Sequence, residues 1–277
     1  MLSYKHGYHA GNHADVLKHI CLIQAYKTLK RHHNSISYID THAGSGNYNF
    51  KSDYMSKNKE YENGITKLEG YKYENQSIKY YLKILRNINN SKKMTFYPGS
   101  PSIMSHITDS SDKMTFYELH NNEVKLLKKH LSKQINSKVF NKDGFSFTSQ
   151  KINPKEKTLV LVDPSYEIKN DFERVITILK TLDEKYSNVT ALIWYPVLNI
   201  ENNDLFIENI RRLGSNKITR IELPLKKYNE ETGMKGSGII LFNGSNYLTN
   251  NIKDCVKELY QIFKDENCNI KPKIQRL

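Results

Sequence analysis

Short runs of apolar residues alternate along the chain with longer segments in which apolar residues recur every three or four positions. Runs of the first kind are typical of strands buried in a sheet, and the longer spacing is typical of helices packed on it. The pattern predicts strands over residues 36–40, 114–118, 137–140, 159–162, 189–195, 217–223 and 236–242. Helices between strands connect them in parallel, so we expect an α/β fold with a doubly wound, mostly parallel sheet of seven strands.

The first helix is predicted to begin after Asn12, whose side chain can accept hydrogen bonds from the first turn. Asp15 would lie in that turn, where the helix dipole favours a negative charge. The apolar positions lie roughly on one face: Val16, Ile20, Ile23 and Leu29. The positions expected to supply charge to this helix are Lys18, Lys27, Lys30 and Arg31.

Residues 48–97 interrupt the alternation of strands and helices. This segment is rich in Lys, Asn, Tyr and Glu, and residues 78–85 have helical periodicity, so we expect a small, exposed, basic helical insertion. A lid without a binding role is the alternative. The α/β pattern resumes at Ser100, a natural helix cap, which is followed by Pro101 at the favoured first helical position. The predicted parts of the chain are residues 1–47, 48–97 and 98–277.

Basic residues outnumber acidic residues by 42 to 29, which gives a formal net charge of +13. They are spread along the chain rather than gathered in a tail, so the folded surface should attract polyanions, nucleic acid first. A proteome rich in Lys, Asn and Ile would produce the same excess without such a partner.

The three cysteines form no CxxC pair, which favours reduced thiols in a cytoplasm over a disulfide framework or a zinc site. Four histidines suggest a metal site, but no carboxylate or thiol completes a ligand spacing, so we predict no metal. They are His6, His9, His13 and His19. No apolar run approaches the roughly 20 residues that span a bilayer, and no targeting segment is recognisable. We expect a soluble cytoplasmic protein.

A glycine-containing loop, residues 40–46, follows the first strand and permits three interpretations. A dinucleotide-binding loop would have glycine at position 49, which is Asn49. A phosphate-binding P-loop would have glycines at two further positions, which are Ser45 and Phe50. The remaining interpretation is the Asp-x-x-x-Gly-x-Gly loop of an S-adenosylmethionine site, formed by Asp40, Gly44 and Gly46.

Acidic residues also occur at or just after the ends of the next strands: Glu118, then Asp143 with Gly144, then Asp163. Because the carboxyl ends of parallel strands line one edge of the sheet, we expect these side chains to converge. An adenosine-bearing cofactor would suit them. Glu118 can accept both ribose hydroxyls, Asp143 can accept from the adenine amine, and the backbone at Gly144 can pack closely.

The peptide Asp163-Pro-Ser-Tyr166 follows the apolar run 159–162. Considered alone, it is equally well an ordinary strand-ending turn or a clamp for a planar nitrogenous ring. In the clamp, the Asp163 carboxylate and the Pro164 carbonyl would hold the two N–H bonds of an exocyclic amine, while Tyr166 stacks on the base. The order of the preceding acidic strand ends favours the clamp.

The chain resembles the bacterial 23S ribosomal RNA adenine-N6 methyltransferase family called methyltransferase J, over essentially its whole length. The opening segment, residues 3–19, is the most specific part of the resemblance. The other matching motifs are Asp40-Thr-His-Ala-Gly-Ser-Gly46, Tyr97-Pro-Gly-Ser-Pro101, Glu118-Leu-His120, Asp143-Gly144, Asp163-Pro-Ser-Tyr166 and Trp194-Tyr-Pro196. Enzymes that methylate amines usually have a second proline where this chain has Ser165.

The resemblance implies a Rossmann-like S-adenosylmethionine-dependent methyltransferase fold with an inserted helical subdomain. It also implies a substrate-side role for Tyr4. The implied cofactor contacts are His19, His42, Ser100, Glu118, Asp143, Gly144 and Asp163, to which the loop interpretation adds Gly44. The activity that we expect is methylation of the N6 amine of one adenine of 23S ribosomal RNA, which in this family is adenine 2030. Asp163, Pro164 and Tyr166 would be the catalytic residues of a monomeric enzyme.

Two other functions remain open from the sequence. A DNA adenine-N6 methyltransferase would use the same clamp, and only the resemblance and the lack of a large target-recognition domain favour RNA. A non-catalytic RNA-binding protein on a Rossmann-like scaffold would also be basic, but it would have no need to bind S-adenosylmethionine.

Overall fold

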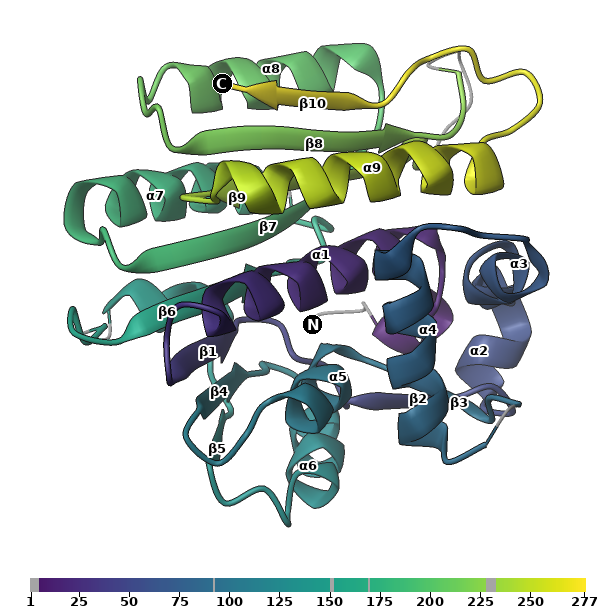
Figure 1. Cartoon of the computed structure of the whole chain (residues 1–277), viewed down its shortest axis with the longest axis horizontal. Coiled ribbons are helices and arrows are strands. Elements are labelled where there is room, and N and C mark those ends of the chain that lie inside the picture. The colour runs from purple at the N-terminus through teal and green to yellow at the C-terminus, as the bar shows by residue number, and fades with distance from the viewer. Residues whose placement is uncertain (1–4, 92, 150–151, 169, 228–232) are drawn as a thin grey trace.

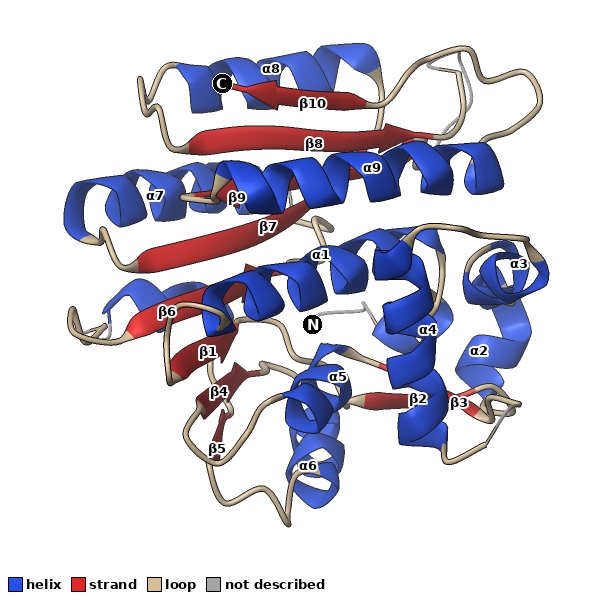
Figure 2. Ribbon diagram, in the orientation of Figure 1, coloured by secondary structure: helices blue, strands red, loops and turns tan. Residues whose placement is uncertain are grey.

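An eight-stranded sheet with helices on both faces forms the centre of the protein (Figures 1 and 2). It is seen in a computed structural model that describes residues 5–91, 93–149, 152–168, 170–227 and 233–277. The strands in spatial order are β10 (Lys273–Arg276), β8 (Ile218–Pro224), β9 (Gly236–Phe242), β7 (Val189–Val197), β6 (Lys157–Val162), β1 (Ile36–Asp40), β4 (Lys113–Tyr117) and β5 (Ser137–Phe140). A separate antiparallel pair consists of β2 (Asn47–Asn49) and β3 (Phe96–Pro98).

Strands β5, β4, β1, β6 and β7 are parallel, whereas β9 is antiparallel to both β7 and β8. The predicted α/β fold with a mostly parallel sheet is therefore confirmed, and all seven predicted strands are present. The eighth strand, β10, pairs antiparallel with the edge strand β8. The strand has Ile274 as its one apolar residue, which is too little alternation for the sequence pattern to indicate a strand.

The predicted strand 189–195 was expected to end at Pro196, and this is wrong, because β7 continues through Pro196 to Val197. The pairing of β7 with β6 stops at Ile193, while its pairing with β9 continues through Pro196. Beyond Ile193 the strand is therefore paired on one side only, and proline is tolerated where a strand lacks a second neighbour.

Helices cover the two faces of the sheet in two groups (Figure 1). One face carries α1 (His13–Lys30) and α9 (Asn246–Phe263), and the other carries α7 (Asn170–Lys185) and α8 (Ile200–Arg211). The remaining helices are α2 (Asp53–Asn58), α3 (Ile65–Gly70), α4 (Gln76–Asn89), α5 (Ser100–Ile107), α6 (Asn121–His130) and the 3-10 turns His6–Tyr8, Glu60–Asn63 and Gly144–Ser149. No helix in the described ranges is both long and apolar enough to cross a membrane.

Helix α1 begins as predicted, since the Asn12 side chain accepts hydrogen bonds from the N–H groups of Ala14 and Asp15. Its charged positions differ from the expectation. Lys18 is only 3% exposed, because α1 is covered by α4 and α9 and its first turns face the interior. A lysine that was expected to supply surface charge is thus buried.

Helix α5 also begins differently from the prediction that Ser100 caps it. Gly99 occupies the cap position, and Ser100 is the first helical residue. The N–H of Gly99 donates to the Gly46 carbonyl at 2.8 Å, which fixes the chain one residue before the helix.

The segment 48–97 contains α2, α3 and α4, and the predicted helical periodicity lies within α4. Its apolar side chains, Ile78 and Leu82 among them, belong to the same core as those of α1. The Glu258 carboxylate of α9 accepts from the N–H groups of Glu74 and Asn75 at 2.6 and 2.9 Å, which ties the start of α4 to the sheet-covering layer. The division of the chain at 48 and 97 stays a prediction.

Candidate active site

A cavity of about 360 Å³ opens where β1, β4, β5 and β6 end. This is the carboxyl edge of the parallel strands, where α/β sheets bind ligands. The predicted residues that line it are His19, His42, Gly44, Ser100, Glu118, Asp143, Gly144, Asp163 and Pro164. Ser165, the position that departs from the family motif, also lines it. The structure therefore brings together residues that span 146 positions of the sequence.

The glycine loop forms one wall of the cavity. Asp40 is fully buried at the end of β1, where burial raises its pKa to about 6, and its carboxylate accepts from the Tyr38 hydroxyl at 2.8 Å. Gly44 has a φ of +61°, and an added Cβ would collide with the Tyr48 hydroxyl. The loop thus requires glycine here, and its backbone borders the cavity directly.

Glu118, directly after β4, accepts one backbone N–H on each carboxylate oxygen. Gly44 donates to Oε2 at 2.8 Å, and His120 donates to Oε1 at 2.7 Å. Each oxygen retains a second lone pair. A carboxylate held in this way can accept hydrogen bonds from two neighbouring hydroxyls, as a ribose would present them.

Asp143 and Gly144 form the next part of the wall. An added Cβ at Gly144 would collide with the Thr41 carbonyl oxygen. The loop after β5 therefore approaches the loop after β1 so closely that only glycine fits at position 144. The Asp143 carboxylate accepts from the Phe145 N–H at 3.0 Å and forms an ion pair with Arg174. The Arg174 guanidinium lies 3.8 Å from the centroid of the Phe145 ring. The sequence did not indicate this role of Arg174 in orienting Asp143.

Two histidines in the wall are neutral at physiological pH. His19 Nδ1 lies 2.7 Å from the Tyr97 hydroxyl, and His42 Nδ1 lies 2.7 Å from Thr41 Oγ1. Burial lowers the pKa of each imidazole to about 3. Each ring therefore offers one hydrogen bond donor or acceptor without adding a charge to the cavity.

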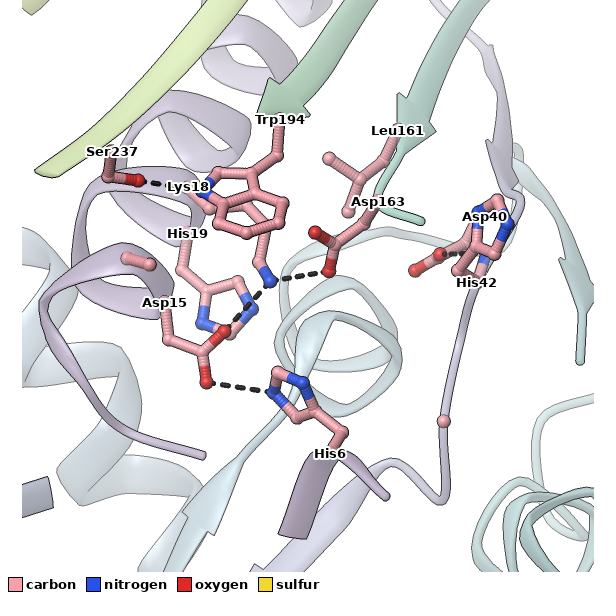
Figure 3. A network of polar contacts seen from close by, with 12 residues as sticks. His6, Asp15, Lys18, His19, Asp40, His42, Leu161, Asp163, Trp194 and Ser237 are labelled. Atoms are coloured by element: carbon pink, nitrogen blue, oxygen red, sulfur yellow. Dashed lines mark hydrogen bonds and ion pairs between the residues drawn. The ribbon is translucent and has the colours of Figure 1, made fainter. Parts of the chain in front are cut away.

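Lys18 connects the start of α1 to the end of β6 (Figure 3). Its ammonium lies 2.5 Å from Asp163 Oδ2 and 2.8 Å from Asp15 Oδ1. Burial opposes the charge, but these two carboxylates raise the pKa of Lys18 above its ordinary value. His6 Nε2 lies 3.0 Å from Asp15 Oδ2, so the row His6, Asp15, Lys18, Asp163 is continuous. Asp163 Oδ1 accepts no hydrogen bond from the described residues and remains available.

Lys18, like Arg174, is a site residue that the sequence reasoning missed. The signal was its spacing: Asp15 is one helical turn earlier, and neighbours at i and i+3 meet on a helix. His19, the next residue, was already expected at the cofactor. A lysine beside it that can reach an acidic residue of the same helix is a candidate for a buried ion pair rather than for a surface charge.

Tyr166 lies outside the residues that line the cavity. Its hydroxyl donates to the Trp194 carbonyl at 2.6 Å, and its ring lies 4.5 Å from the Phe172 ring, centroid to centroid. Its φ is +55°, in the left-handed region that is uncommon for a residue with a side chain. Stacking of Tyr166 on a base therefore stays a prediction, and Tyr4 lies outside the described residues.

The cavity suits an adenosine-bearing cofactor. Gly44 and Gly144 border the cavity at positions where an added Cβ would collide with a neighbouring residue. The Glu118 carboxylate has free lone pairs, and the apolar side chains of Leu119 and Phe145 also line the cavity. Among the described residues, no group of three or more His, Cys, Asp or Glu side chains could hold a metal ion.

The chain is similar to known proteins over most of its length. Residues 33–271 match the family model described as "Ribosomal RNA large subunit methyltransferase D, RlmJ". The Haemophilus influenzae protein named "Ribosomal RNA large subunit methyltransferase J" is 35% identical over 245 residues, which cover 88% of this chain and 87% of the relative. The Escherichia coli protein of the same name is 32% identical over 244 residues, with the same coverage.

A crystal structure of a Legionella pneumophila protein is also similar. It is 31% identical, has a TM-score of 0.85, and the match covers 97% of this chain and 98% of that one. The family model and the two named relatives each cover most of the chain. This chain therefore belongs to the ribosomal RNA large subunit methyltransferase J family, and it is an enzyme.

Proposed function

We propose that the protein transfers a methyl group from S-adenosylmethionine to the N6 amine of one adenine of 23S ribosomal RNA, the family's adenine 2030. The observation that carries this proposal is the position of Asp163 and Pro164 at the end of β6, where both line the cavity that suits an adenosine-bearing cofactor. Lys18 forms an ion pair with the Asp163 carboxylate. The names of the Haemophilus and Escherichia relatives support the ribosomal RNA substrate.

S-adenosylmethionine would supply an electrophilic methyl group. The residues that would hold it are the ones that line the wall: Glu118 for the ribose hydroxyls, Asp143 for the adenine amine, and the backbone of Gly44 and Gly144 for close packing. The Arg174 contact keeps the Asp143 carboxylate in one orientation before the cofactor arrives, which reduces the ordering cost of binding.

The amine of adenine is a poor nucleophile, because its lone pair is delocalised into the ring. Asp163 Oδ1 and the Pro164 carbonyl would each accept one of its N–H bonds and so favour a pyramidal nitrogen whose lone pair points into the cavity. Lys18 holds Asp163 Oδ2, so the carboxylate cannot rotate away. Positioning and fixed charges of this kind account for most of the rate in such a reaction.

The amine must also lose a proton, and Asp163 Oδ1 is the acceptor in reach of it. The target base has to leave its stack first, which costs a few kcal/mol. We propose that Tyr166, and Tyr4 in the opening segment, contact the extruded base, with stacking on Tyr166 offsetting about 1–3 kcal/mol. The aromatic surface around Tyr166, Trp194 and Phe172 supports a base-binding role for this corner.

Purified protein, labelled S-adenosylmethionine and 23S ribosomal RNA from cells lacking the enzyme test the proposal. We expect labelled N6-methyladenosine with the wild type and none with Asp163→Ala or Tyr166→Ala. Each variant should still fold, and Tyr166→Ala should still bind S-adenosylhomocysteine. Turnover like that of the wild type in either variant would remove the assignment of these residues.

Two alternatives are separated by the same assay. Duplex DNA as substrate distinguishes a DNA adenine methyltransferase, which the family descriptions do not favour. Membership of a methyltransferase family argues against a non-catalytic RNA-binding protein, and saturable S-adenosylmethionine binding would exclude it. We further propose that the enzyme acts as a monomer in the cytoplasm, where its buried free cysteines Cys21, Cys255 and Cys268 stay reduced.

A further inference from the structure

A second concave surface lies on the outer side of the glycine loop, where the loop meets the end of α6. It has a volume of about 440 Å³. Its lining residues, which we call the basic groove, are Ser45, Asn47, Leu126, Lys129, His130, Ser132 and Lys133. Six of these seven side chains carry hydrogen-bonding groups, two of them are ammonium groups, and none is acidic.

The groove lies in a strongly basic part of the chain. Residues 124–142 contain six lysines and no aspartate or glutamate. The lysines are Lys125, Lys128, Lys129, Lys133, Lys138 and Lys142, and all six are exposed. None of them forms an ion pair with a described residue. The positive charge of this surface is therefore not neutralised within the described part of the protein.

Protection of the sheet edge does not account for this charge. Lysine on an edge strand discourages pairing with another chain, and Lys138 lies on β5, which is the last strand on its side of the sheet. The other five lysines lie on α6 and in the turns around β5. Of these five, Lys142 lies over the Phe140 ring, 5.9 Å from its centroid.

Hydrogen bonds fix the floor of the groove. The buried Ser102 hydroxyl lies 2.6 Å from the Gly46 carbonyl oxygen and 2.7 Å from His130 Nε2. Asn47 Nδ2 lies 3.1 Å from His130 Nδ1. The glycine loop and the last turn of α6 are thus connected, so the groove keeps its shape without a ligand and binding costs less ordering.

The groove and the cofactor cavity share the glycine loop. Gly44 lines the cavity and donates to Glu118, whereas Ser45 and Asn47 line the groove. Helix α6 begins beside Glu118 and extends away from the cavity, over about 15 Å for its ten residues. A polyanion in the groove would therefore lie next to the active site and could continue towards it.

We propose that the basic groove and the lysines around it bind the sugar–phosphate backbone of the substrate RNA. This inference rests on the proposed function, since it assigns a second contact to the same substrate. Ammonium, hydroxyl and amide donors are the groups that proteins use for phosphate and sugar oxygens. Such contacts set the register of the substrate without reading its sequence, and they weaken as salt rises.

The test compares two variants with the same change in charge. Lys125→Gln/Lys129→Gln/Lys133→Gln removes the two ammonium groups of the groove and one surrounding lysine, and glutamine keeps the helix propensity of lysine. The matched control, Lys180→Gln/Lys185→Gln/Lys253→Gln, removes three exposed cations from α7 and α9, which lie on the two faces of the sheet away from α6 (Figure 1). Binding of 23S ribosomal RNA is measured across a series of KCl concentrations, together with kcat, KM and S-adenosylhomocysteine affinity.

Loss of three phosphate contacts should reduce the slope of log Kobs against log salt by about 2 to 3 in the groove variant. KM for RNA should rise while kcat and S-adenosylhomocysteine affinity stay unchanged, and arginine at the three positions should restore the slope. The control variant should keep the wild-type slope. Equal slopes in the two glutamine variants would overturn the inference. A wild type that binds this RNA but does not methylate it would instead contradict the proposed function.

Discussion

Replacement of Lys18 by methionine is the sharpest test of how the active site is held. The side chain is 4% exposed and lies between Asp15, at 1%, and Asp163, at 13%. Removing one member of a buried ion pair costs about 3–5 kcal/mol, because the remaining charge stays buried without its partner. Asp15 keeps the His6 contact and the Gly11 N–H, and Asp163 is partly hydrated, so we expect the lower end, about 3 kcal/mol.

Urea denaturation of the wild type and of Lys18→Met at neutral pH measures this cost. The double variant Lys18→Met/Asp15→Asn also removes the buried charge of Asp15, so it should lose less unfolding free energy than Lys18→Met alone. The same single variant should lower kcat by about 100-fold, because Asp163 is no longer held in place. A loss below about 1 kcal/mol together with a wild-type kcat would refute the assignment of Lys18.

Three further changes test separate parts of the site. Gly144→Ala should weaken S-adenosylhomocysteine binding at least about tenfold by calorimetry, because the added Cβ collides with the Thr41 carbonyl; unchanged affinity would contradict the close approach. Tyr166→Phe should cost about 1 kcal/mol in denaturation for the lost hydrogen bond to Trp194 yet retain methylation; loss of turnover would assign the hydroxyl a chemical role. The neutral His19 ring contributes stability that is present above pH 6.5 and is lost as pH falls towards about 3. Between pH 7 and pH 5, the free energy of unfolding of His19→Gln should therefore fall by about 2 kcal/mol less than that of the wild type. Equal decreases in the two proteins would contradict the low pKa of His19.

The fold was predictable where local pattern and tertiary environment agree. The run 159–162 is apolar at every position because β6 is buried on both faces, and such runs identify strands directly. Prediction failed where tertiary pairing decides. Pro196 continues its strand because β6 has already ended beside it, and β10 exists because β8 offers a free edge. Neither neighbour is visible in the local sequence.

The candidate site divides in the same way. Polar residues that follow strands within a few positions, such as Glu118 and Asp143, could be placed from the rule that parallel strands end at one edge. Lys18 and Arg174 could not, because each acts through a carboxylate far away in the sequence, Asp163 in one case and Asp143 in the other. Only the folded chain shows that these cations are held by the acids of the site.

The central claim is that this enzyme methylates N6 of an adenine in 23S ribosomal RNA. Its most direct test is mass spectrometry of ribosomal RNA nucleosides, with position mapping, from cells with and without the gene. We predict that one N6-methyladenosine of 23S ribosomal RNA disappears without the gene and returns with the wild-type gene but not with Asp163→Ala. Unchanged N6-methyladenosine at every mapped position would contradict the account.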